Sequence, residues 1–220
     1  MDTTVFSYIF ENIPDISIDE VYRYLGIKGE VSNEIKEDVL SCLSLLKKEI
    51  SPKACYMKVP VKITEKTVDL GVFKAESEKL SMNLKGSTDA FLIAVTLGAG
   101  CDRLINRFSS ISPIKALYFQ AAGTALIEAL CDFLCDNILP TDKNLKPRFS
   151  PGYGDLSLEL QKDFLDILDT RRKIGLYLTE GGIMVPLKSV SAIVGITDEK
   201  TCKLSCKDCG KNCEFMRVEK

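Results

Sequence analysis

The spacing of apolar residues along the chain alternates between a helical and an extended period. Apolar positions that recur every three or four residues, with Lys and Glu between them, indicate amphipathic helices, whereas short alternating runs indicate strands. Ser17, followed three residues later by a Glu, marks a helix start, and Pro140 ends the longest helical pattern. The pattern predicts helices over residues 17–26, 35–50, 101–108, 113–139 and 157–172, and strands over 56–63, 67–70, 90–97, 176–179 and 189–196.

Two of the predicted strands differ in character. Residues 90–97 form a continuous apolar run that ends in a glycine turn, which is typical of a buried central strand. Residues 56–63 alternate, and Pro60 within them indicates an edge position because proline cannot donate a hydrogen bond to a neighbouring strand. After Ile196 the apolar content falls sharply. We therefore expect helices and strands over 1–88 that pack on a core over 89–196 as one globular domain, followed by a Cys-rich tail over 197–220.

Composition narrows the class of protein. With 45% hydrophobic residues and 29 basic against 31 acidic side chains, the chain has the balance of a soluble globular protein and lacks the basic excess of a nucleic-acid-binding protein. No apolar run approaches the roughly 18 residues that cross a bilayer. The N-terminus lacks the basic region and cleavage site of a signal peptide. We expect a cytoplasmic protein with no membrane and no nucleic-acid partner.

The chain contains no histidine, which limits its chemistry. Ser-His-Asp and Cys-His triads, His-ligated zinc and an imidazole ligand to haem or to corrinoid cobalt are all excluded. A reaction here must use carboxylates, thiols, Arg, Lys, Tyr, backbone groups or a borrowed cofactor. The glycine turn at 96–100 lacks the spacings of the dinucleotide-binding and P-loop motifs, so we expect no phosphate site there.

A loop around Arg148 is the first candidate site. Gly152 and Gly154 allow its backbone to approach a ligand closely, and a predicted helix begins just afterwards. The guanidinium of Arg148 is suited to holding a ligand carboxylate by paired hydrogen bonds, and Tyr153 offers a ring and a hydroxyl group. The alternative is a structural turn whose arginine is merely solvated.

Two acidic residues on the longest predicted helix form a second candidate. Glu128 and Asp132 lie one helical turn apart, so their carboxylates project from the same edge of that helix. One interpretation is a solvated stripe. The functional interpretation requires Glu128 to face the same cavity as Arg148, which spacing alone does not show.

The cysteines form a third candidate. In a chain without an export signal, the nine cysteines are expected to be reduced thiols. Cys202, Cys206, Cys209 and Cys213 lie close together among Lys and Arg residues, as in a metal site. Their compact spacing and the nearby cations favour an iron–sulfur cluster over zinc, with free thiols as the remaining alternative. The other cysteines fall in apolar patterns and are expected in the core: Cys42, Cys55, Cys101, Cys131 and Cys135.

Several stretches share their order and spacing with a known family. Residues 148–153, Arg-Phe-Ser-Pro-Gly-Tyr, look like an Arg-x-x-x-Gly-Tyr loop. Residues 168–180 are similar to a helix that leads into Gly-x-x-Leu-Thr-Glu, and 184–186 and 189–191 resemble Met-x-Pro and Ser-Val-Ser. Residues 127–134 look like a helix that supplies an acidic residue. In these motifs the chain resembles a free-standing form of the S-adenosylmethionine-binding activation (reactivation) domain of cobalamin (vitamin B12)-dependent methionine synthase.

The resemblance implies a fold and a set of ligand contacts. The fold would be α+β, a twisted antiparallel sheet with flanking helices that binds S-adenosylmethionine in a shallow cleft. By matching positions, Arg148 would hold the ligand carboxylate and Glu128 would meet its ammonium group. Ser150 and Gly152 would offer backbone contacts. Tyr153 would line the site near the corrinoid and is the candidate catalytic residue.

The resemblance also implies a mechanism and partners. The domain would dock over oxidised cob(II)alamin, where one electron and the methyl group of S-adenosylmethionine regenerate methylcobalamin, so the chain would serve as a methyltransferase subunit in methionine biosynthesis. Because it has no cobalamin-binding segment, it would act in trans on a cobalamin-binding methionine synthase or related corrinoid protein, with flavodoxin, ferredoxin or the Cys-rich tail delivering the electron.

The chain departs from the family over four consecutive residues of the loop. Residues 154–157 read Gly-Asp-Leu-Ser where the family has Pro-Ala-Cys-Pro, so the corrinoid-facing contacts differ. Two alternatives stay open. One is a reactivator of another corrinoid methyltransferase. The other is a non-catalytic module that binds S-adenosylmethionine or a corrinoid protein and has a structural metal-binding tail.

Overall fold

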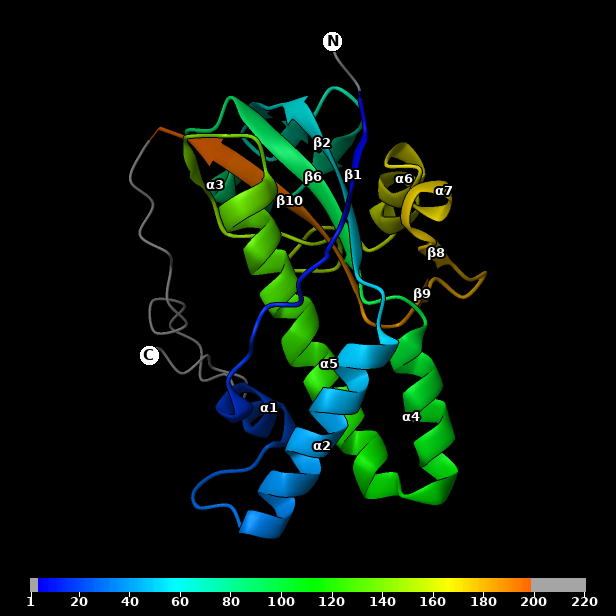
Figure 1. The fold of residues 1–220 in the computed structure, drawn as a ribbon. Helices are drawn as coiled ribbons and strands as arrows, with labels where there is room; N and C mark the ends of the chain where they lie inside the picture. The colour runs from blue at the N-terminus through cyan, green and yellow to red at the C-terminus, as the bar shows by residue number, and fades with distance from the viewer. Residues whose placement is uncertain (1–3, 199–220) are drawn as a thin grey trace.

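The protein is built around an antiparallel sheet flanked by helices. The computed structural model describes residues 4–198. The strands of the main sheet twist across one another in the order β1-β2-β6-β10-β7, and every neighbouring pair is antiparallel (Figure 1). This confirms the α+β fold with a twisted antiparallel sheet. The strands of this sheet are β1 (Phe6–Ile9), β2 (Lys53–Pro60), β6 (Asp89–Thr96), β7 (Asn144–Leu145) and β10 (Ser189–Thr197).

Two small sheets and eight helical segments complete the described part of the chain. The small sheets are β3 (Lys62–Thr64) with β4 (Thr67–Asp69) and β5 (Lys74–Glu76), and β8 (Tyr177–Leu178) with β9 (Met184–Val185). The helices are α1 (Ile18–Leu25), α2 (Asn33–Glu49), α3 (Glu78–Asn83), α4 (Gly100–Ile111), α5 (Pro113–Phe133), the π-helical turn η1 (Leu134–Ile138), α6 (Leu160–Ile167) and α7 (Thr170–Ile174).

The central strand β6 is buried on both faces, which explains its continuous apolar run. Successive side chains of a strand point to opposite faces. Ile93 and Val95 therefore pack in the cluster that contains α2, α4 and α5, whereas Leu92 and Ala94 pack in the cluster that contains α3, α6 and α7. Burying side chains of this size on both faces stabilises the sheet by about 2 kcal/mol for each large residue.

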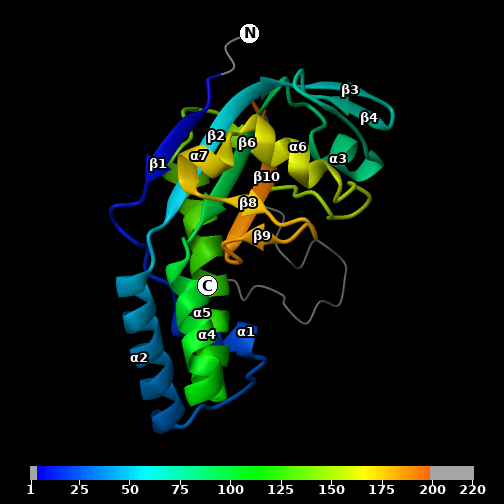
Figure 2. The same cartoon turned by 90° about the vertical axis from the view of Figure 1, so that its right-hand side faces the viewer.

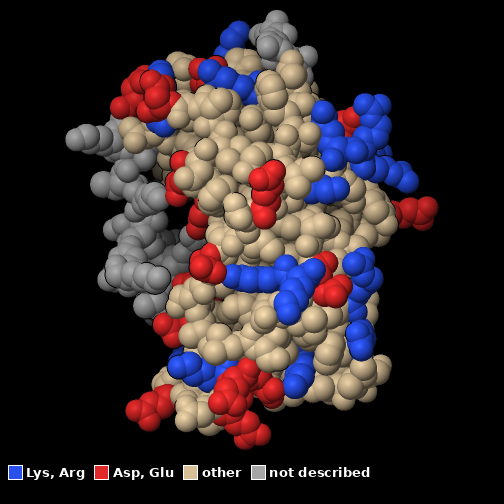
Figure 3. Space-filling view, in the orientation of Figure 1, with Lys and Arg blue, Asp and Glu red and all other residues tan. Residues whose placement is uncertain are grey.

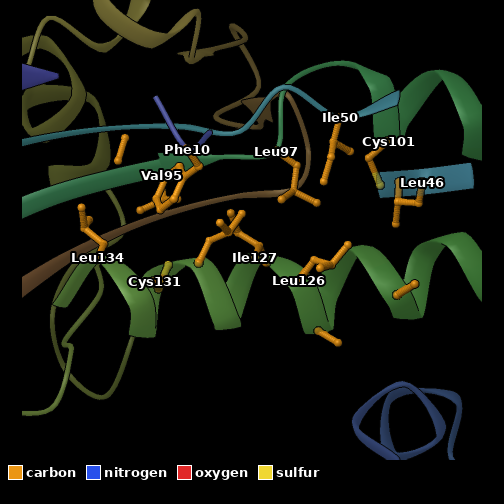
Figure 4. Packing of buried hydrophobic residues seen from close by; sticks show 14 of the residues in the cluster. Phe10, Leu46, Ile50, Val95, Leu97, Cys101, Leu126, Ile127, Cys131 and Leu134 are labelled. Atoms are coloured by element: carbon orange, nitrogen blue, oxygen red, sulfur yellow. The ribbon is translucent and has the colours of Figure 1, made fainter. Parts of the chain in front are cut away.

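The long helix α5 joins the sheet to a lobe of helices. One end of α5 crosses the sheet, and the other packs against α1, α2 and α4 (Figures 1 and 2). Ile127, Cys131 and Leu134 point from α5 and η1 towards the strands, where Phe10 and Val95 meet them (Figure 4). Pro113–Ile138 is long and apolar enough to pass as a membrane-spanning helix by composition, but 61% of its apolar window is buried within the protein, as in a core helix.

Three sequence predictions need correction. The predicted helix over 157–172 is two short helices, because Asp169 adopts the left-handed conformation (φ 48°) between α6 and α7. The predicted strand over 56–63 ends at Pro60, and Val61 separates β2 from β3. The prediction of an edge position for Pro60 was wrong for the strand as a whole, since β2 lies between β1 and β6. At Pro60 itself only β6 pairs, because β1 begins opposite Tyr56 and runs away from Pro60.

Candidate functional site

The backbone around Arg148 is held by β10. Lys146 N–H donates to Gly195 O (2.8 Å), and Phe149 exchanges two hydrogen bonds with Ile193 (2.9 and 2.8 Å). Phe149 is buried in the α3 and α6 side of the core. Because neighbouring residues of an extended segment point to opposite faces, Arg148 points to the α5 side.

Arg148 meets the two carboxylates of the predicted acidic stripe. Its Nη2 lies 2.7 Å from Glu128 Oε2, and its Nη1 lies 2.5 Å from Asp132 Oδ1. The Arg148 side chain is 18% exposed, against 32% for Glu128 and 45% for Asp132. Arg148 therefore contacts both Glu128 and Asp132, whereas a cavity shared by Glu128 and Arg148 stays a prediction.

The surroundings of the guanidinium keep it charged. Burial alone would lower the pKa of Arg148, but the neighbouring carboxylates of Asp132 and Glu128 outweigh burial and raise this pKa above its usual value. Beneath them, burial raises the pKa of the Cys131 and Cys135 thiols, so both are neutral at physiological pH. The site thus presents a permanently charged guanidinium between two carboxylates, with two neutral thiols nearby.

The loop that follows Arg148 makes a tight turn. Gly152 and Gly154 both have positive φ (83° and 65°), which residues with a side chain rarely adopt. Tyr153 N–H donates to Ser150 O (3.0 Å), and Gly152 N–H donates to Leu156 O (2.9 Å). Tyr153 is 59% exposed and stands edge-on to the Phe149 ring, with centroids 5.4 Å apart. The turn leaves the Tyr153 hydroxyphenyl group at the surface.

Asp155 anchors this loop, and sequence reasoning missed it. Its carboxylate accepts hydrogen bonds from Ser77 Oγ, Glu78 N (2.9 Å) and Lys79 N (3.3 Å), so it caps the first turn of α3. The hydrogen bond from Ser77 and those from the backbone lower the pKa of Asp155. A loop of Gly152–Gly154 is thereby tied to a helix that is 78 residues earlier in the chain.

We predict that Asp155→Ala lowers the melting temperature, and that the loss depends on pH. The pKa of Asp155 is depressed in the folded protein, so its stabilisation is present above about pH 4 and disappears as the pH falls through the folded-state value. Thermal melts of the unmodified protein and of Asp155→Ala at pH 7 and at pH 3 measure the difference in melting temperature. The difference in melting temperature should shrink at pH 3, and an equal difference at both pH values would contradict the capping role.

A cavity lies beside this loop, and Arg148 does not line it. It has a volume of about 620 Å³ and is lined by residues of α6, α7 and the β8–β9 hairpin. Leu158 lines one end of it and also packs against Gly152, where an added Cβ would lie 3.1 Å from Leu158 Cδ1. Basic side chains gather over α6 and α7 (Figure 3). The cavity is therefore a second concave surface that borders the loop.

The predicted metal ligands Cys202, Cys206, Cys209 and Cys213 lie outside the described residues, so the metal site stays a prediction. Within residues 4–198, no group of three or more His, Cys, Asp or Glu side chains is arranged to hold a metal ion. Burial raises the pKa of Cys55 and Cys101 to about 12. The cysteines expected in the core are buried, except Cys135, which is half-buried: Cys42, Cys55, Cys101, Cys131 and Cys135.

Comparison with known proteins identifies the fold. No protein-family model and no curated protein sequence matches the chain. Among solved structures, the crystal structure of the MetH reactivation domain bound to AdoHcy superposes with a TM-score of 0.63, covering 92% of this chain and 81% of that chain at 16% identity. The chain has the fold of the MetH reactivation domain. This confirms the fold implied by the sequence motifs.

Proposed function

We propose that the protein is an activation subunit that binds S-adenosylmethionine and acts in trans on a cobalamin-dependent methionine synthase or a related corrinoid protein. The contact of Arg148 with Glu128 carries this proposal. This contact places a cation and a carboxylate side by side, which are the two charges that bind the carboxylate and the ammonium group of an α-amino acid. The pair lies next to a glycine turn, in a fold that is also found in a domain bound to AdoHcy.

The site fits the amino-acid end of the ligand. The planar guanidinium of Arg148 can hold a carboxylate by two parallel hydrogen bonds, and Glu128 can accept from an ammonium group. Both side chains are partly buried, so these charges attract their partners more strongly than they would in open water. Ser150 and Gly152 would contribute backbone contacts, and the exposed Tyr153 would line the corrinoid side.

The proposed role of the chain is positioning. When bound, S-adenosylmethionine supplies a sulfonium methyl group for transfer to cobalt, after one electron has reduced cob(II)alamin in the partner. Residues of this chain would bind and orient that ligand and exclude water, which requires no histidine base. The partner would hold the cobalamin, and a flavodoxin or ferredoxin, or a cluster on the cysteines of the tail, would supply the electron.

A reactivation assay tests the proposal. A methionine synthase that lacks its own activation domain is loaded with cob(II)alamin under anaerobic conditions and mixed with a low-potential reductant, S-adenosylmethionine and this protein. We expect the absorption spectrum of methylcobalamin to appear only when all components are present. Binding of S-adenosylmethionine without methylcobalamin formation would instead support a non-catalytic binding module.

Tyr153→Ala separates binding from reactivation in the same assay. Because the Tyr153 ring is exposed and stands edge-on to Phe149, whereas Arg148 pairs with the carboxylates of α5, we expect reactivation to slow at least about tenfold while the affinity for S-adenosylmethionine changes less than about threefold. Isothermal titration calorimetry measures the affinity. An unchanged reactivation rate would contradict the role of Tyr153 on the corrinoid side.

A further inference from the structure

We infer that Asp132 is an internal competitor for the ligand carboxylate, so that S-adenosylmethionine binds by displacing it from Arg148. This inference rests on the proposed function, because it requires that Arg148 receive the carboxylate of an amino-acid ligand. It concerns a residue that the motifs leave without a role.

The geometry of Arg148 supports the exchange. Its two terminal nitrogens bind different carboxylates, Nη1 to Asp132 at 2.5 Å and Nη2 to Glu128 at 2.7 Å. A ligand carboxylate held by two parallel hydrogen bonds needs two N–H groups of the same guanidinium. An incoming carboxylate therefore competes with a carboxylate that is already in place.

Exposure and chemistry indicate which of the two carboxylates leaves. Asp132 is the more exposed, at 45% against 32%, and lies one turn nearer the end of α5, so it regains hydration when it turns away. Glu128 remains useful in the occupied site, because an α-amino acid brings an ammonium group that needs an acceptor. Asp132 thus pairs with a partly buried cation when the site is empty and yields to the ligand when it fills.

This exchange predicts opposite effects for two substitutions that remove the same charge. Asp132→Asn leaves a neutral and weaker competitor, so S-adenosylmethionine should bind about fivefold more tightly. Glu128→Gln replaces the charged acceptor for the ligand ammonium with a neutral and weaker one, and should weaken binding at least about tenfold. If Asp132 acted only through its charge, Asp132→Asn would weaken binding, because the ligand carries a positive sulfonium group.

Calorimetric titration with two probes tests the inference. Decarboxylated S-adenosylmethionine lacks the competing carboxylate, so Asp132→Asn should leave its affinity unchanged or reduce it, while tightening that of S-adenosylmethionine. Asp142→Asn, which removes an exposed carboxylate between η1 and β7, is the charge-matched control and should change neither. Thermal melts verify that each variant is folded, and Asp132→Ala provides a second removal of the competitor.

Two failures can be told apart. If the unmodified protein binds neither probe, the proposed function fails and the inference fails with it. If the unmodified protein binds S-adenosylmethionine and both Asp132 variants bind it equally or more weakly, the competition is overturned while the proposed function stands. Equal tightening for both probes would also overturn it, since the effect would then not depend on the ligand carboxylate.

Discussion

Replacing Arg148 with alanine is expected to weaken the binding of S-adenosylmethionine at least about 30-fold, the lower end of the loss seen when one partner of a buried charge pair is removed. The ligand carboxylate would lose its counter-ion, and Glu128 and Asp132 would be left beside each other without the cation that now joins them. Isothermal titration calorimetry measures the affinity. Arg172→Ala, which removes an 86% exposed arginine paired with Asp169, is the control and should bind normally.

Arg148→Lys refines this prediction. A lysine keeps the charge but cannot form two parallel hydrogen bonds in a plane, so its affinity should fall between those of the unmodified protein and Arg148→Ala. If Arg148→Lys bound S-adenosylmethionine as tightly as the unmodified protein does, the charge alone would account for binding. Normal binding by Arg148→Ala would show that the ligand lies elsewhere.

Replacing Gly100 with alanine is expected to lower the free energy of unfolding by about 3 kcal/mol. Gly100 begins α4 where the end of α2 passes, and an added Cβ would lie only 1.9 Å from the backbone O of Glu49 and 2.6 Å from its C atom. The obstructing atoms are backbone, and the adjacent Ile50 N–H is bonded to Leu46 O, so a shift would disturb the end of α2.

Urea unfolding of Gly100→Ala measures this loss, with Gly181→Ala as the matched control. Gly181 has no positive φ, and an added Cβ would meet only Thr179 Oγ1 at 3.9 Å, which is ordinary contact. The free energy of unfolding of Gly181→Ala should lie within about 1 kcal/mol of that of the unmodified protein. Similar unfolding midpoints for the two variants would contradict the close approach of α4 to α2.

The elements with strong periodic patterns could be predicted from the sequence, and those defined by tertiary pairing could not. Strand β6 and helix α5 were predicted because their apolar positions form long, regular runs. Strand β1 was missed because most of its four residues are exposed and its pairing with β2 alone defines it. The break in the predicted helix falls at Asp169, and no glycine or proline stands there to indicate a break in the sequence.

The candidate site follows the same division. Helical spacing placed Glu128 and Asp132 on one edge, but their meeting with Arg148 depends on η1 ending α5 and on the pairing of residues 146–149 with β10. No local pattern reveals that pairing. The partnership of Asp155 with Ser77 joins segments far apart in the chain and is likewise visible only in the fold.

The most direct test of the central claim is a crystal structure of this protein soaked with S-adenosylhomocysteine, the demethylated form of the proposed ligand. We predict that its carboxylate binds Arg148, that its ammonium group faces Glu128, and that its adenosyl portion follows the Gly152 turn. Asp132 should have moved away from Nη1. Ligand bound only in the cavity between α6, α7 and the β8–β9 hairpin would contradict this account.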